Sequence, residues 1–147
     1  MNTGFPGGHP TRLVHLPHMR SAPRLLGAAI GGDDFVLVEW DDDGATTSGD
    51  RPIAPLHLHE RDDEAWYVLE GTLGFRVGDE LVEASAGAAV FVPAGTPHSF
   101  WNARPSRARY VLVMTPCIAA LVEAIHEPGA RDDLDALFHR FDSRLVH

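Results

Sequence analysis

The sequence contains no lysine, and this absence excludes two kinds of site. All 12 basic residues are arginines. Schiff-base enzymes need a reactive lysine, and P-loop nucleotide-binding sites need a lysine that reaches the phosphates. The 21 acidic residues outnumber the basic ones and give a formal net charge of −9. Because phosphate binding requires a basic patch, we expect no nucleic-acid partner.

Cysteine and long apolar runs are also scarce. With Cys117 as the single cysteine, the chain has neither an internal disulfide nor a multi-cysteine zinc site. Cys117 is either a small buried residue or, near a helix N-terminus, a reactive thiol. No apolar run approaches the roughly eighteen residues of a transmembrane helix, and no secretory signal pattern is present. We therefore expect a cytoplasmic protein with no membrane partner.

The chain is about one domain long, and its apolar pattern divides it into segments. Residues 1–24 are rich in glycine, proline and histidine without a period, which predicts an N-terminal arm. Residues 25–115 hold short apolar runs separated by turn residues. The alternation from Leu73 to Val77 has the period of two that is typical of a half-buried strand. This segment is predicted to be a β-barrel or sandwich of antiparallel hairpins.

Residues 116–147 change to helical spacing and predict a C-terminal helical extension packed on the barrel. Thr115 and Pro116 are typical of an N-cap and a first helical residue. Asp132 or Asp133 is expected to cap a second helix. The first helix is indicated by apolar residues that recur every three or four positions, namely Ile118, Leu121, Val122 and Ile125.

Three histidines and one glutamate form a pattern that suggests metal chemistry. His57 and His59 are two residues apart in an extended stretch, so both rings project from the same face of a strand. Glu64 follows at the entry of the next strand. His98 comes directly after a proline- and glycine-containing turn, which is stiff enough to aim its side chain. These four residues are the candidate ligands of one ion.

Imidazole and carboxylate ligands together suit a divalent transition metal ion, namely iron, manganese, nickel, copper or zinc. In a six-coordinate ion they leave two positions for water, dioxygen or a chelating substrate. The alternative is a set of structural histidines that holds no metal.

Strand parity predicts which side chains share the interior of the barrel with these ligands. Trp66 and Val68 lie on the same face as Glu64, whereas Phe100 and Asn102 lie on the same face as His98. We expect these four to line an apolar pocket for a small organic molecule. The alternative for Trp66 and Phe100 is that they fill the core.

The arrangement resembles the two sequence motifs of the cupin superfamily over about residues 36–114. The first motif is similar to His57-x-His59 followed by Glu64 and Gly71, and it departs at Arg51, where a glycine is expected. The second is matched throughout, at Gly87, Pro93, Gly95, His98 and Asn102.

This resemblance implies a mainly β fold, the cupin double-stranded β-helix (jelly-roll) barrel, followed by C-terminal α-helices. It implies that His57, His59, Glu64 and His98 are metal ligands. Among the activities of the family we expect a dioxygenase-like oxidoreductase similar to the quercetin dioxygenase-like cupins, with Glu64 as ligand and base. A non-redox isomerase or lyase and a non-catalytic ligand-binding cupin remain alternatives. Because small cupins are commonly dimers, a homodimer is expected.

Overall fold

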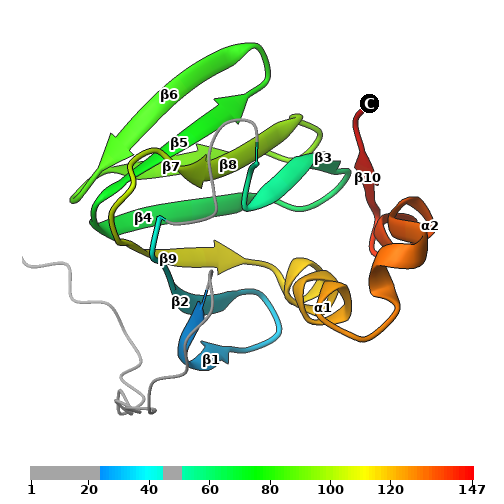
Figure 1. Ribbon diagram of the computed structural model, residues 1–147. Coiled ribbons are helices and arrows are strands. Elements are labelled where there is room, and N and C mark those ends of the chain that lie inside the picture. Colours follow the sequence, from blue (N-terminus) through cyan, green and yellow to red (C-terminus); the bar gives the residue numbers. More distant parts are fainter. Residues whose placement is uncertain (1–23, 45–50) are drawn as a thin grey trace, which may run out of the picture.

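The computed structural model describes residues 24–44 and 51–147, and within them ten strands form two antiparallel sheets (Figure 1). The first sheet has the order β1-β2-β9-β4-β7 and contains Arg24–Gly31, Val36–Asp42, Ala108–Met114, Glu64–Glu70 and Ala89–Val92, respectively. The second has the order β10-β3-β8-β5-β6 and contains Ser143–Leu145, Ala54–His59, His98–Asn102, Thr72–Val77 and Glu80–Ser85.

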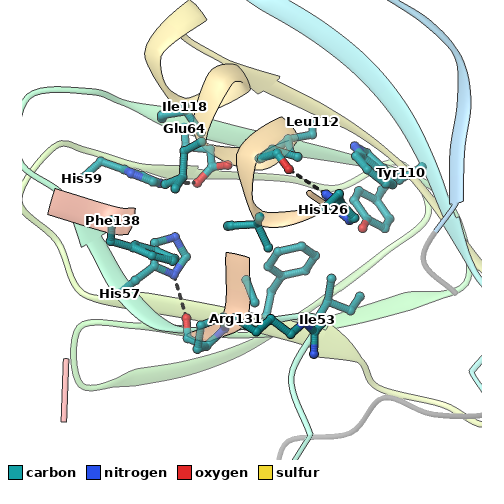
Figure 2. A pocket seen from close by; sticks show the side chains of 17 residues that line it. Ile53, His57, His59, Glu64, Tyr110, Leu112, Ile118, His126, Arg131 and Phe138 are labelled. Atoms are coloured by element: carbon teal, nitrogen blue, oxygen red, sulfur yellow. Dashed lines mark hydrogen bonds and ion pairs between the residues drawn. The ribbon is translucent and has the colours of Figure 1, made fainter. Parts of the chain in front are cut away.

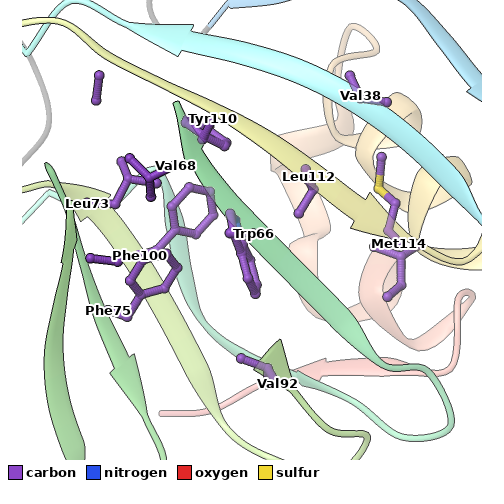
Figure 3. Close-up of a cluster of buried hydrophobic side chains, with 13 residues drawn as sticks. Val38, Trp66, Val68, Leu73, Phe75, Val92, Phe100, Tyr110, Leu112 and Met114 are labelled. Carbon is purple, nitrogen blue, oxygen red and sulfur yellow. The ribbon is translucent and has the colours of Figure 1, made fainter. Parts of the chain in front are cut away.

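The core lies between the two sheets because each strand places alternate side chains toward the other sheet. In β9 the buried residues are Ala108, Tyr110, Leu112 and Met114, and the residues between them are only half-buried. Figure 3 shows the resulting cluster, in which aromatic rings from both sheets meet. The Trp66 ring on β4 packs edge-on against Phe75 on β5, with ring centroids 5.3 Å apart.

A glycine is required at the turn between β4 and β5. Gly71 has a φ of +75°, and a Cβ atom there would lie 2.5 Å from the carbonyl oxygen of Arg107. Any other residue would combine an unfavourable backbone conformation with a steric clash. The turn between β4 and β5 is therefore fixed by the backbone that packs against it.

The predicted C-terminal helices are present at one end of the sheets (Figure 1). α1 spans Pro116–Ile125, and its N-cap Thr115 accepts a hydrogen bond from the Ile118 amide at 3.3 Å. A short 3₁₀ helix, η1 (Ala130–Asp133), leads into α2 (Leu134–His139), which is capped by Asp133. Leu121, Leu137 and Phe138 form a small second core between the helices. No helix in the described part of the chain is long and apolar enough to cross a bilayer.

Two parts of the chain differ from the sequence-based expectation. Residues 116–147 were expected to form a helical extension, but Ser143–Leu145 forms a strand, β10, which pairs with β3. β2 continues through Asp41 and Asp42, although aspartate is depleted in strands. Both aspartates are buried, and Asp42 accepts hydrogen bonds from Gly44 and Asn102.

A mainly β jelly-roll with C-terminal helices is confirmed. The N-terminal arm was expected over residues 1–24. All of it except Arg24, which begins β1, lies outside the described residues. The boundaries proposed at residues 24, 115 and 116 stay predictions.

Candidate metal centre

Two strands of one sheet and one strand of the other bring the four predicted residues together. His57 and His59 lie on β3, His98 begins β8 and stands opposite His57 in the register, and Glu64 begins β4 in the facing sheet. All four are at most 6% exposed. One ligand atom from each lies within 4.8 Å of every other. The cluster therefore spans the interior between the two sheets.

The turn before His98 is held against β3. The amide of Gly95 donates a hydrogen bond to the carbonyl oxygen of His59 at 2.6 Å, and Gly95 has a φ of +78°. The amide of Ala94 donates to the Asp63 carboxylate at 2.9 Å. These contacts connect the turn to His59 and to Asp63, the residue before Glu64, so His98 begins β8 at a fixed position.

Each histidine of the cluster has its Nδ1 atom bound to an oxygen outside the cluster. His57 Nδ1 lies 2.6 Å from the carbonyl oxygen of Pro55, as the dashed line in Figure 2 shows, and His98 Nδ1 lies 2.9 Å from that of Thr96. Because a carbonyl oxygen only accepts, Nδ1 carries the proton in both rings. In the neutral ring, Nε2 then holds a lone pair that is available to an ion.

His59 is oriented by Ser143, a residue that the sequence analysis did not identify. Its Nδ1 atom lies 2.7 Å from Ser143 Oγ, and that hydroxyl donates to the carbonyl oxygen of Phe141 at 2.9 Å. The hydroxyl proton is thereby committed, so the oxygen accepts from His59 and Nδ1 is again protonated. Ser143 stands opposite His59 in the pairing of β10 with β3. No local sequence signal indicates a partner 84 residues away.

Burial and charge set the protonation of the cluster. Burial, followed by the proximity of His98, lowers the pKa of His57 to about 3, so that ring is neutral near pH 7. Burial alone would raise the pKa of Glu64, but the adjacent His59 and His98 rings lower it to about 2. Glu64 is therefore an ionised carboxylate facing imidazole rings.

The contacts at Glu64 fit a cation. His98 Nε2 and His59 Nε2 lie 3.1 and 3.3 Å from the same oxygen, Oε2. His59 Nε2 is buried and makes no hydrogen bond there. A ring lone pair that faces a carboxylate oxygen is repelled by it, and a positive charge between the two removes the repulsion. Two ligands of one ion at about 2.1 Å are at most about 4.2 Å apart, so the cluster needs only a small contraction to hold one.

A cavity of about 330 Å³ opens beside the cluster (Figure 2). His57, His59 and Glu64 lie at one part of its wall. The remaining wall is mostly apolar and comes from the sheets and from the C-terminal helices. It includes Trp40, Ile53, Phe100, Tyr110, Leu112, Ile118, Leu121, Val122, Ile125, His126, Arg131 and Phe138. A concave, largely apolar site with a few polar groups is typical of small-molecule binding.

Only Phe100 of the four predicted pocket residues lines this cavity. Trp66 and Val68 share the face of Glu64 as expected, but they are 1% and 0% exposed and belong to the core. Trp66 packs edge-on against the His98 ring, with centroids 5.8 Å apart. Neither residue lines this cavity, because strand parity gives the face of a residue but not its depth in the barrel.

Asn102 does not line this cavity either. Its side-chain amide donates to Asp42 Oδ1 at 3.0 Å and to the carbonyl oxygen of Ser106 at 2.7 Å, and its oxygen accepts from the Arg104 amide. Four residues of strand after His98 amount to about 13 Å, so Asn102 lies at the far end of β8. There it joins β8 to β2 and to the turn before β9.

Cys117 is not an activated thiol. Its Sγ atom lies 3.5 Å from the carbonyl oxygen of Phe141, and burial together with Asp62 and Asp142 raises its pKa. The helix N-terminus does not overcome these effects, and the small-residue alternative is favoured over a reactive role.

Comparison with known proteins agrees with this fold. Residues 48–114 match the family described as Cupin domain. An uncharacterized protein of Streptomyces coelicolor is 34% identical over 58 residues, which cover 40% of this chain and 49% of that protein. The match therefore spans about half the length of the relative.

Two solved structures extend the similarity beyond the matched span. A protein of Thermus thermophilus is 27% identical to this chain. The alignment covers 65% of this chain and 82% of that protein, with a TM-score of 0.52. An uncharacterized Klebsiella pneumoniae protein with a double-stranded β-helix domain is 18% identical. That alignment covers 74% of this chain and 91% of the Klebsiella protein, with a TM-score of 0.56. The latter shows the fold alone.

Proposed function

We propose, from the premise that this chain carries a cupin domain, that it is a metal-dependent enzyme acting on a small organic molecule, with a dioxygenase-like oxidoreductase activity. The observation that carries the proposal is the orientation of the three imidazoles. Each Nδ1 atom is engaged by an oxygen outside the cluster, so each Nε2 is left for an ion beside the Glu64 carboxylate. A hydrogen bond from the other ring nitrogen to a nearby oxygen is typical of metal-binding histidines.

His57, His59, His98 and Glu64 would hold one divalent ion. When bound, iron, manganese, nickel or copper would supply a Lewis acid and the electron transfer that a reaction with dioxygen needs, whereas zinc would supply the Lewis acid alone. Three neutral ligands and one anionic ligand leave a net positive centre. Such a centre favours a substrate oxygen that is or becomes negatively charged.

The protein's own groups have two roles in this proposal. The apolar wall formed by Leu112, Ile118 and Phe138 excludes water from the space beside the cluster, which strengthens electrostatic interactions there. Glu64 borders the cavity, and Oε1, the carboxylate oxygen that does not face His59 and His98, would accept the proton from a substrate hydroxyl. It would thus act both as a ligand and as a base.

The first test is elemental analysis of the purified protein beside a His57→Ala/His98→Ala variant. We expect about one equivalent of metal in the former and none in the latter. The matched control is His126→Ala, which removes an exposed imidazole that lines the same cavity but lies outside the cluster. This variant should keep its metal.

The metal found selects the next measurement. Iron, manganese, nickel or copper together with oxygen uptake on enol or catechol compounds supports the oxygenase proposal. Zinc without oxygen uptake would replace it with non-redox isomerase or lyase chemistry. A protein that takes up no metal even after reconstitution would refute a metal-dependent enzyme.

A further inference from the structure

Part of the wall of the cavity beside the cluster is formed by residues that lie outside the match to the Cupin domain family. The match ends at Met114, whereas Ile118, Leu121 and Phe138 of the C-terminal helices line the cavity. Phe138 also packs edge-on against the His57 ring, with centroids 5.5 Å apart. The surface that selects a ligand is therefore built partly by an extension outside the matched domain.

This extension brings one cationic side chain to the cavity. Arg131 lies on η1 and lines the wall, and Figure 2 draws it on the same side of the cavity as Ile53. Within residues 24–44 and 51–147, Arg131 has no ion-pair or hydrogen-bond partner. Most of the other arginines in these ranges are paired with carboxylates, as in Arg104 with Glu83 and Arg109 with Glu39. The Arg131 guanidinium is thus available to a ligand.

The rest of the wall favours an apolar, ring-shaped body. Phe100 and Phe138 present aromatic side chains, and Ile53, Leu112 and Leu121 present aliphatic ones. A volume of about 330 Å³ is at the lower end of the range of roughly 300–1,000 Å³ found for small-molecule sites.

The Tyr110 phenol keeps its proton at neutral pH. Burial and the carboxylates of Asp42, Glu64 and Asp41 raise its pKa well above 10. It therefore adds no negative charge that would oppose an anionic ligand.

We propose that the cavity binds a small aromatic carboxylate whose carboxylate group pairs with Arg131 and whose ring lies against the apolar wall. A guanidinium presents parallel N–H donors that match a carboxylate, which makes arginine selective for this group. The inference deepens the proposed function, because it names the substrate class of that same cavity. It depends on residues of the extension rather than on the metal ligands.

The test compares two probes of equal shape, naphthalene-2-carboxylate and the neutral naphthalene-2-carboxamide. Their dissociation constants are measured by calorimetry with the full-length protein, both metal-loaded and after removal of metal with a chelator. We expect the carboxylate to bind about tenfold more tightly in both forms, which is typical of one charge-assisted pair. Arg131→Gln should abolish this preference, and Arg131→Lys should retain part of it.

The matched control is Arg140→Gln, which removes an exposed arginine that follows α2 and does not line the cavity. It should leave the preference unchanged. A preference that survives in Arg131→Gln, or that disappears when the metal is removed, would place the carboxylate elsewhere and overturn the inference. The same holds if neither probe binds. Failure of the proposed function is read separately, from the metal content and oxygen uptake.

Discussion

Ser143 fixes the ring of His59 from almost the other end of the chain. Its hydroxyl donates to the Phe141 carbonyl and so accepts from His59 Nδ1. The hydroxyl is buried, with Ser143 only 1% exposed, so water does not readily replace it. The tautomer of His59, a candidate ligand, is therefore decided by a single hydroxyl oxygen on β10.

Replacing Ser143 with alanine is therefore expected to weaken metal binding without removing a ligand. The loss should be about 10- to 100-fold in affinity, the usual effect of deleting a hydrogen-bond partner of a ligand. Competition with a chromophoric chelator measures it. Ser143→Thr should restore most of the affinity, and Ser85→Ala, which alters an exposed hydroxyl on β6, should change nothing. Equal affinities for Ser143→Ala and the unsubstituted protein would contradict this role.

The element that closes the cavity is the pair of C-terminal helices. α2 is only six residues long and is too short to be stable by itself. It is held by Leu137 and Phe138, which pack against Leu121 of α1, and by β10, which follows it. Phe138 contacts this small core and the His57 ring together. The same side chain thus stabilises the extension and shapes the site.

Phe138→Ala should lower the free energy of unfolding by about 3–5 kcal/mol, because it leaves a cavity where a buried ring was. Urea denaturation followed by circular dichroism measures this. Phe35→Ala is the control, since Phe35 is 57% exposed and its loss should change stability by about 0.5 kcal/mol or less. If Phe138→Ala were as stable as Phe35→Ala, the helices would not be held by this contact.

The whole molecule has an apolar row on the outer face of its first sheet. Leu37, Val113, Ala65 and Phe91 stand side by side in the register of β2, β9, β4 and β7. Phe91 is 61% exposed, and Tyr67, one step further along β4, is 45% exposed. Contiguous exposed apolar side chains are typical of protein–protein contact surfaces. The homodimer expected from the sequence remains a prediction, and this face is where we place it.

Light scattering at micromolar concentration is expected to give twice the chain mass of 16.0 kDa. The double variant Phe91→Glu/Tyr67→Glu should give a single chain mass, since like charges at the centre of a symmetric contact repel each other. Its circular dichroism spectrum should be unchanged, because both side chains face outward. Leu81→Glu, at an exposed position on β6 in the other sheet, is the control and should stay dimeric. A monomer in the unsubstituted protein would refute the homodimer.

Local patterns were sufficient for the strands, the helix caps and the four clustered residues. The spacing of His57 and His59 needs only the period of a strand, and the turn before His98 needs only its prolines and glycine. Thr115 and Asp133 cap helices through contacts within three residues. Local patterns do not give depth in the barrel, and Asn102 and Trp66 have the expected parity but lie outside the lining of the cavity.

The sequence by itself determined the fold class and the candidate ligands, because both depend on periodicity and turn chemistry within short segments. Only the tertiary structure decided which surface faces those ligands. Arg131, Phe138 and Ser143 reach the site through the return of the C-terminal segment onto β3, a contact between residues more than 80 positions apart. Such pairings depend on how whole elements pack, and no local pattern in the chain records that packing.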